Sequence, residues 1–149
     1  MGFPDSCIRG IPNPSCLLRD GNCVVANATL FPFPGERVRL DGWIEESVNW
    51  MDDEDAVAFT LSQAKEDGEH QFKIGVAVVP RIELDKIGKK YGTERFTYDR
   101  SPTEVNRYHG NLLLKDIGGR PFKRMICAVL AHNSEIILRE DHQMGIGEV

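Results

Sequence analysis

The chain has 149 residues, of which 41% are hydrophobic and 28% are charged. This length and composition predict one globular domain over residues 1–149 and exclude a disordered, charge-rich chain. The formal net charge of −5 argues against nucleic acid as the main partner, because that binding depends on many Lys and Arg contacts. Without a basic and apolar leader or a run of about 18 apolar residues, we expect a cytoplasmic protein that does not enter membranes.

Four cysteines have spacings that fit neither a zinc knuckle nor a disulfide framework. We therefore expect free thiols and predict no metal site and no cofactor. Cys127 stands among apolar residues and is predicted to pack in the core as a small hydrophobe.

Three prolines and two glycines fall within residues 1–15. Because proline cannot donate to a strand ladder, this density predicts an extended arm that lies over the domain rather than a regular strand. We expect the arm to be held by the apolar residues Phe3, Ile8 and Ile11.

The next segments alternate between apolar runs and turn residues. Runs at 16–19 and 23–31 flank Asp20-Gly21-Asn22 and predict a β-hairpin, since glycine supplies the positive φ of a tight turn. Apolar residues interleaved with charge over 38–48 predict one or two short strands.

The middle of the chain carries residues that typically begin and end helices. Acidic residues at 52–55 stand at the start of a predicted helix over 53–66, where their negative charge interacts favourably with the helix dipole. They lack the alternating spacing and the glycine of a calcium-binding loop. A β-branched run over 72–79 predicts a central strand, and Pro80 and Gly92 bound a predicted helix over 81–91.

Strands are predicted at 95–98 and 108–114, and we expect them to pair. Residues 134–140 fit either a helical continuation or an edge strand, and the tail 141–149 is predicted to fray. A last helix opens at Pro121, with a core-facing apolar stripe of Phe122, Met125, Ile126, Val129 and Leu130.

These elements predict an α+β fold. We expect a mainly antiparallel, mixed sheet of about five to seven short strands, with an N-terminal β-hairpin and two or three helices packed on it. A βαβ-like unit over 72–114 would make part of the sheet parallel.

His109 is the candidate catalytic residue. Histidine titrates near neutral pH, and Gly110 beside it lets a ligand or a backbone approach closely. The alternative is a hydrogen-bonded histidine at the start of a strand.

A candidate anion site lies at the start of the last helix. Cations oppose the helix dipole at that end, so their presence favours an anionic partner, although no P-loop pattern is present. The alternative is solvated charge or ion pairing. The residues concerned are Gly118, Gly119, Arg120, Lys123 and Arg124.

Aromatic residues gather in the proline-broken stretch between the hairpin and the first helix. Aromatic side chains in loops favour protein contact surfaces, although they also cap cores. The residues predicted to contact a partner are Phe31, Phe33, Trp43 and Trp50.

No catalytic serine or cysteine signature is present, which argues against covalent catalysis. The leading interpretation is a small non-catalytic protein-binding domain that acts as a subunit, adaptor or inhibitor in a larger assembly. The alternative is a small enzyme or ligand-binding domain for a phosphorylated or other anionic molecule, with His109 and the 118–124 turn in one pocket.

Overall fold

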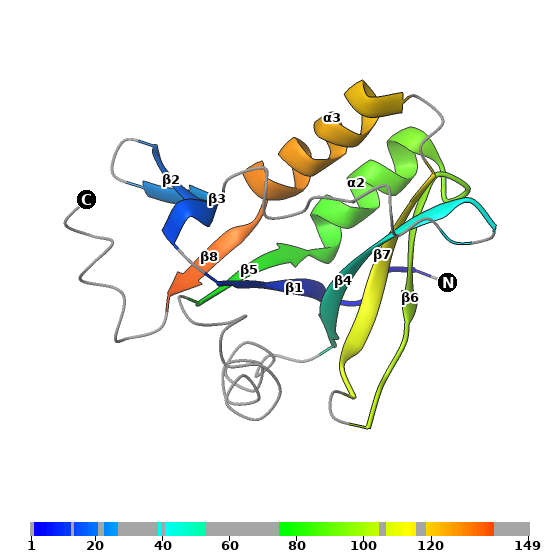
Figure 1. Ribbon diagram of the computed structural model, residues 1–149, viewed down its shortest axis with the longest axis horizontal. Helices are drawn as coiled ribbons and strands as arrows, with labels where there is room; N and C mark the ends of the chain where they lie inside the picture. Colours follow the sequence, from blue (N-terminus) through cyan, green and yellow to red (C-terminus); the bar gives the residue numbers. More distant parts are fainter. Residues whose placement is uncertain are drawn as a thin grey trace.

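The computed structural model describes residues 2–12, 14–20, 23–26, 39, 41–52, 75–104, 107–115 and 119–138. Over these residues it contains a six-stranded sheet, a two-stranded sheet and two α-helices (Figure 1). This arrangement confirms the predicted α+β class. The predicted helix over 53–66 and the tail 141–149 lie outside the described residues.

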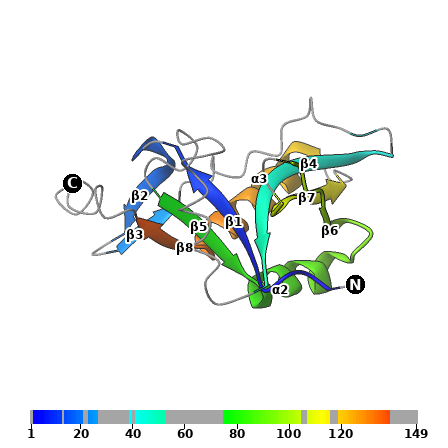
Figure 2. The same cartoon turned by 90° about the horizontal axis from the view of Figure 1, so that it is seen from below.

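All neighbouring strands of the large sheet run antiparallel. The sheet twists strongly between its two edges, as Figures 1 and 2 show. Its strand order is β6 (Phe96–Arg100), β7 (His109–Lys115), β4 (Trp43–Met51), β1 (Ser6–Ile11), β5 (Gly75–Pro80) and β8 (Glu135–Leu138).

The small sheet pairs β2 (Leu17–Asp20) with β3 (Cys23–Ala26), after a short 3-10 helix η1 (Pro14–Cys16). This pairing confirms the predicted hairpin between its two described strands. The turn residues 21–22 and the predicted strand end at 27–31 lie outside the described part of the chain.

Each helix crosses the sheet to join two strands that run in the same direction. Helix α2 (Arg81–Tyr91) joins β5 to β6, and α3 (Gly119–His132) joins β7 to β8. The three strands β7, β4 and β1 separate β6 from β5. The expected βαβ-like connection is therefore present, but it places no described strands side by side in parallel.

Helix α2 has the predicted bounds, 81–91. Pro80 stands at its N-cap in an extended conformation, where its missing N–H costs nothing. At the other end Gly92 adopts φ 88°, and its N–H donates to the Gly88 carbonyl at 2.8 Å. The glycine ends the helix because other residues rarely adopt this backbone conformation.

The N-terminal segment corrects one prediction. Residues Ser6–Ile11 form β1, a central strand that pairs with β4 on one side and β5 on the other. The prolines do not prevent this, because they lie before and after the strand rather than within it. The anchoring residues were predicted correctly, since Phe3, Ile8 and Ile11 are all buried.

The two faces of the sheet bury separate apolar clusters, because successive side chains point to opposite sides. The helix face holds the larger cluster, to which α2 contributes Leu84 and Ile87 and α3 contributes Ile126 and Leu130. The opposite face holds a smaller cluster of Ile8, Met51, Val76 and Val78.

Helix α3 is present, but it is rotated from the predicted stripe. Ile126 is fully buried as expected, whereas Val129 is only half-buried and Met125 is exposed. Cys127 and Ala131 are buried in their place, which confirms that Cys127 packs as a core residue. After the helix, the ambiguous segment forms β8, an edge strand on β5.

Candidate functional site

His109 begins β7 and lies against the loop that follows β6. Its Nδ1 donates to the Ser101 carbonyl at 2.9 Å, and the Ser101 N–H donates to the His109 carbonyl at 2.9 Å. Because a carbonyl only accepts, this contact assigns the ring proton to Nδ1. The two bonds tie the end of β6 to the start of β7.

The candidate anion-binding residues lie elsewhere. Gly118 and the side chain of Arg120 lie outside the described residues, and α3 begins at Gly119. Lys123 is half-buried and Arg124 is exposed on the helix.

The structure separates His109 from the start of α3. The seven-residue strand β7 lies between them, which corresponds to about 20 Å. Leu112, three residues after His109 on β7, packs in the helix-face cluster. Because successive side chains of a strand point to opposite faces, the His109 side chain points to the other side of the sheet. The described residues therefore do not form the shared pocket that the enzyme alternative requires.

Both tryptophans lie on β4: Trp43 falls within 38–48, where one or two short strands were predicted, whereas Trp50 lies beyond that segment. They occupy opposite ends of the strand and, by alternation, opposite faces of the sheet. The Lys115 Nζ stands 5.2 Å from the centre of the Trp43 ring. Phe31 and Phe33 lie outside the described residues, so they stay predictions.

Trp50 instead joins a group of aromatic and arginine side chains at the end of β4, β6 and β7. The guanidinium carbon of Arg100 lies 3.8 Å from the Trp50 ring centre, and Tyr108 meets the indole edge to face at 5.4 Å. Arg107 lies 5.1 Å from the Tyr108 ring. We call Trp50, Tyr98, Arg100, Arg107 and Tyr108 the Trp50 cluster.

Polar contacts hold Arg100 in place over the indole. Its Nε donates to the Tyr98 hydroxyl at 3.0 Å, and its Nη2 forms an ion pair with Asp52. The hydrogen bond to Tyr98 and the contacts with Asp52 raise the pKa of Arg100, so the guanidinium stays charged. Asp52 directly precedes the predicted helix over 53–66, which lies outside the described residues, and the structure shows Asp52 as the partner of this arginine.

Gly110 makes room for the indole. A Cβ at this position would lie 2.9 Å from the Asp99 carbonyl oxygen and 3.1 Å from Cδ1 of Trp50. The sequence predicted that a ligand or a backbone approaches closely at this glycine, and the groups that approach are the β6 backbone at Asp99 and the indole of Trp50.

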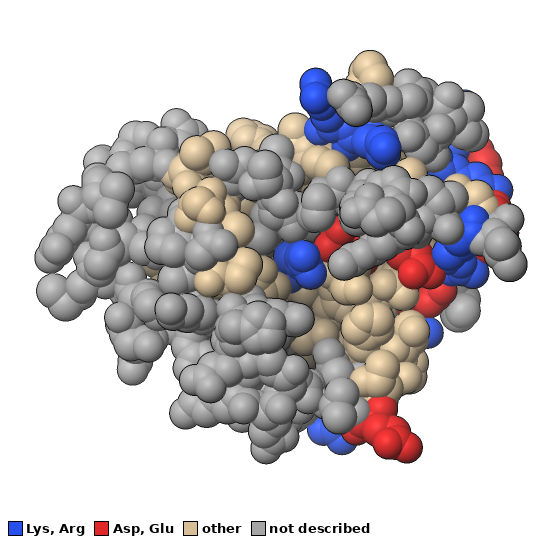
Figure 3. All heavy atoms as spheres, viewed as in Figure 1, with Lys and Arg blue, Asp and Glu red and all other residues tan. Residues whose placement is uncertain are grey.

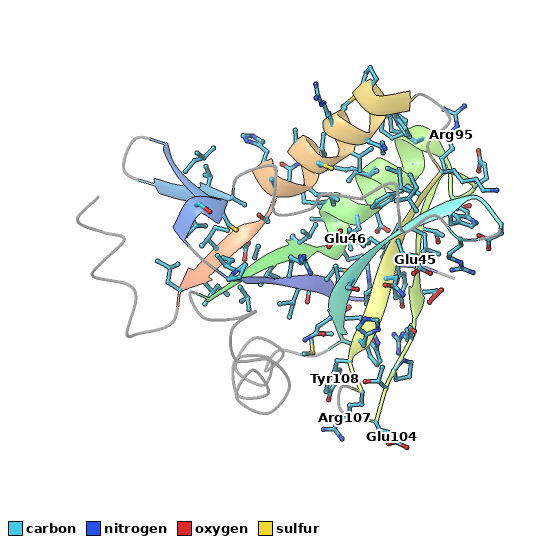
Figure 4. The ribbon with its side chains drawn as sticks, viewed as in Figure 1. Glu45, Glu46, Arg95, Glu104, Arg107 and Tyr108 are labelled. Atoms are coloured by element: carbon cyan, nitrogen blue, oxygen red, sulfur yellow. The ribbon has the colours of Figure 1, made fainter. Side chains whose placement is uncertain are left out.

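The Trp50 cluster is held together by these contacts but is partly open to solvent. The Arg100 side chain is 45% exposed, and Trp50 and Tyr108 are half-buried. The indole Nε1 is buried and has no hydrogen-bond acceptor among the described residues. Figure 4 labels Arg107, Tyr108 and Glu104 at the lower tip, and Figure 3 shows a basic and an acidic group there beside uncharged surface.

A small surface pocket lies on the other side of Tyr98. Its volume is about 190 Å³, and the Phe3 ring, which stacks 5.9 Å from the Tyr98 ring, forms part of its wall. It lies between the first residues of the chain, α2 and β6. Its lining residues are Gly2, Phe3, Asp85, Gly88, Lys89, Thr93, Thr97 and Tyr98.

The helix-face core contains one buried carboxylate and two buried thiols, those of Glu46, Cys7 and Cys127. Glu46 is fully buried and forms an ion pair with Arg9 at 3.1 Å; Figure 4 shows it between β4 and the helices. Burial, reinforced by the Glu46 carboxylate, raises the pKa of Cys127 to about 11. Burial and the charge of Asp52 likewise raise the pKa of Cys7. Both thiols are therefore protonated at neutral pH, where they are poor nucleophiles.

Within the described ranges, no group of three or more His, Cys, Asp or Glu side chains is arranged to hold a metal ion. No described helix has both the length and the apolar character needed to cross a membrane. No family model, curated protein or solved structure matches the chain.

Sequence reasoning named Trp50 but missed its neighbours in the cluster. Tyr98 and Arg100 lie about fifty residues further along the chain, and no local pattern indicates that they meet Trp50. Arg107 and Tyr108 precede His109 in the sequence, but only His109 was predicted as a functional residue in that segment.

Proposed function

We propose that this chain is a small non-catalytic protein-binding domain, and that the Trp50 cluster is the surface through which it binds. It would serve as a subunit, adaptor or inhibitor in a larger assembly. The observation that carries the proposal is the stacking of Arg100 on Trp50 at a partly exposed end of the sheet.

The residue types support protein recognition. Trp, Tyr and Arg are the side chains that most often dominate the binding energy of protein interfaces, where they are buried at the centre of the contact. A partner that covers Arg107 and Tyr108 would complete the burial of aromatic rings that are now half-covered.

The ordering of the cluster also favours binding. Arg100 is fixed by Trp50, Tyr98 and Asp52 before any partner arrives. A side chain that is already held loses less rotamer entropy on binding, so more of the contact energy appears as affinity. Gly110 contributes by letting the indole lie against the strand.

The enzyme alternative has less support from the geometry. It required His109 and the start of α3 in one pocket, and these lie at opposite ends of β7. The buried thiols Cys7 and Cys127 do not supply a nucleophile in its place, because burial raises their pKa values.

The test is partner capture followed by direct binding. Proteins retained by the tagged chain from extracts of its own source cells are purified, and their affinity is measured by calorimetry for the wild type and for Arg107→Ala. Because Arg107 is exposed, its loss should leave folding intact while weakening binding about tenfold or more.

Lys90→Ala is the matched control. Lys90 is also a cation beside a tyrosine, 5.3 Å from the Tyr91 ring, but it lies on α2 outside the cluster. We expect this variant to bind as the wild type does. The absence of any direct protein partner, or equal affinity for Arg107→Ala and the wild type, would contradict the proposal.

A further inference from the structure

Strand β6 is an edge strand with outward-facing backbone groups. The Arg95 carbonyl accepts from the Lys115 N–H at 2.8 Å, and the Ser101 N–H donates to the His109 carbonyl at 2.9 Å. Bonding to β7 alternates along an antiparallel strand, so Thr97 and Asp99 face β7 as well. The N–H and C=O groups of Tyr98 and Arg100 are therefore directed away from the sheet, at the edge that Figure 2 shows.

The described residues of β6 lack the features that usually prevent an edge strand from pairing with another chain. Natural edges are blunted by charged side chains or by proline. The five residues of β6 include no proline, and its two charged side chains are held over the sheet faces. Asp99 binds Arg39 at 3.1 Å, while Arg100 lies on Trp50.

A pocket adjoins this edge where an added strand would place a side chain. The pocket of about 190 Å³ is lined by Thr97 and Tyr98 from β6 and by Phe3 and Gly88. An apolar cavity of about 150 Å³ is large enough to hold benzene. The pocket is comparable in volume, but it is open to solvent, and two charged side chains of α2 also line it. Its aromatic wall of Phe3 and Tyr98 suits one aromatic or branched apolar side chain.

A second copy of the chain does not supply that side chain through its own β6. Phe96 is fully buried, and the rings of Phe96 and Tyr98 already contact Phe3, at 5.5 and 5.9 Å. Arg100 is held by Trp50 and Asp52. The side chains on the helix face of β6 are thus committed within their own molecule.

We infer that the edge of β6 binds an extended segment of a partner protein as an added strand, with one aromatic or branched apolar side chain in the adjoining pocket. The inference rests on the proposed function and specifies the partner's chemistry. Backbone bonds to Tyr98 and Arg100 supply affinity, and the pocket supplies selectivity. The added strand runs from the pocket to the Trp50 cluster, so the edge and the cluster form one surface.

The test uses a phage-displayed library of random nine-residue peptides, panned against the full-length chain. Enriched peptides are synthesised, and their affinities are measured by fluorescence anisotropy. We expect enrichment of sequences that share an aromatic or branched apolar position and contain no proline beside it. Failure to enrich any peptide overturns the inference and leaves the partner-capture test of the proposed function unaffected.

Two variants of one residue isolate the backbone bond. Tyr98→Ala and Tyr98→Pro both remove the ring, but only the proline also removes the outward N–H. Proline is tolerated at such edge positions, and circular dichroism verifies that both variants fold. We expect Tyr98→Pro to bind the peptides about tenfold more weakly than Tyr98→Ala. Equal binding overturns the edge model, and if Arg107→Ala weakens the same peptides, the proposed function stands without it.

Amide hydrogen exchange provides the second readout. A bound strand protects the amides of Tyr98 and Arg100, whereas those of Thr97 and Asp99 already bond to β7 and change little. Protection without this alternation contradicts strand addition. Protection of Tyr98 that grows with protein concentration in the absence of peptide shows that a second copy occupies the edge, which also overturns the inference.

Discussion

Replacement of Gly110 by alanine tests whether the Trp50 cluster depends on its packing against β7. The added Cβ would stand 2.9 Å from the Asp99 carbonyl oxygen and 3.1 Å from Cδ1 of Trp50. The carbonyl belongs to the β6 backbone and cannot withdraw without disturbing the ladder to β7. The clash with the carbonyl therefore strains the β6–β7 ladder, and the indole must also tilt away, which weakens its stacking with Arg100.

The expected cost follows from overpacking in a well-packed site, about 1–3 kcal/mol. A loss of about 2 kcal/mol shifts the urea midpoint by about 1 M, given a denaturant slope of about 2 kcal/mol per molar. The melting temperature falls by about 4–8 °C for a chain of this size.

The assay is urea unfolding followed by tryptophan fluorescence. The chain has two tryptophans, so a Trp43→Phe background makes Trp50 the sole reporter. Gly2→Ala is the control, because a Cβ at Gly2 meets no atom within 4 Å. An unchanged midpoint for Gly110→Ala, together with unchanged Trp50 emission, would refute the packing argument.

Three further predictions concern the core. Arg9→Ala should cost about 3–5 kcal/mol in urea unfolding, because it leaves the Glu46 carboxylate buried without its arginine. A second change, Glu46→Leu, should recover most of that loss, and no recovery would show that the loss does not come from the buried carboxylate. Ile126→Ala should lower the free energy of unfolding by about 2–5 kcal/mol and Val129→Ala by clearly less, since only Ile126 is fully buried. A larger loss for Val129→Ala in thermal unfolding would contradict the observed orientation of α3. Because the pKa of Cys127 is raised from 9.0 to about 11 in the folded protein, the unfolded chain loses this proton first, so stability should fall between about pH 9 and 11. Urea titrations across that range should show a smaller fall for Cys127→Ala than for the wild type, and identical slopes would contradict the assignment.

Local signals predicted much of the fold. Helix α2 was predicted with its observed bounds because Pro80 and Gly92 mark both ends. The pairing of β6 with β7 followed from two β-rich runs joined by a polar loop. In both cases the determining physics lies within a few residues of the element.

Predictions that depended on tertiary placement were less accurate. Proline density suggested an arm at 1–15, but the prolines flank β1, and its neighbours β4 and β5 come from distant parts of the chain. The buried face of α3 was predicted around Val129, whereas Cys127 and Ala131 are buried in its place. The segment that forms β8 carried a pattern compatible with helix and strand alike, and only the open edge of β5 decides between them.

The candidate site shows the same limit. Trp50 was predicted as a partner contact from its residue type, but its partner Arg100 lies fifty positions away. His109 and the start of α3 lie apart because the seven residues of β7 separate them, a consequence of the predicted strand over 108–114 that the shared-pocket hypothesis did not take into account. Residue type therefore predicted one member of the cluster, whereas the other members come together only in the folded sheet.

The most direct test of the proposed binding surface is hydrogen exchange of the chain alone and in complex with a captured, purified protein partner. We expect protection over residues 96–110, which include β6 and the start of β7, with α3 unchanged. Protection confined to residues 119–124, with exchange over 96–110 unaltered, would contradict it and would place the binding surface at the start of α3.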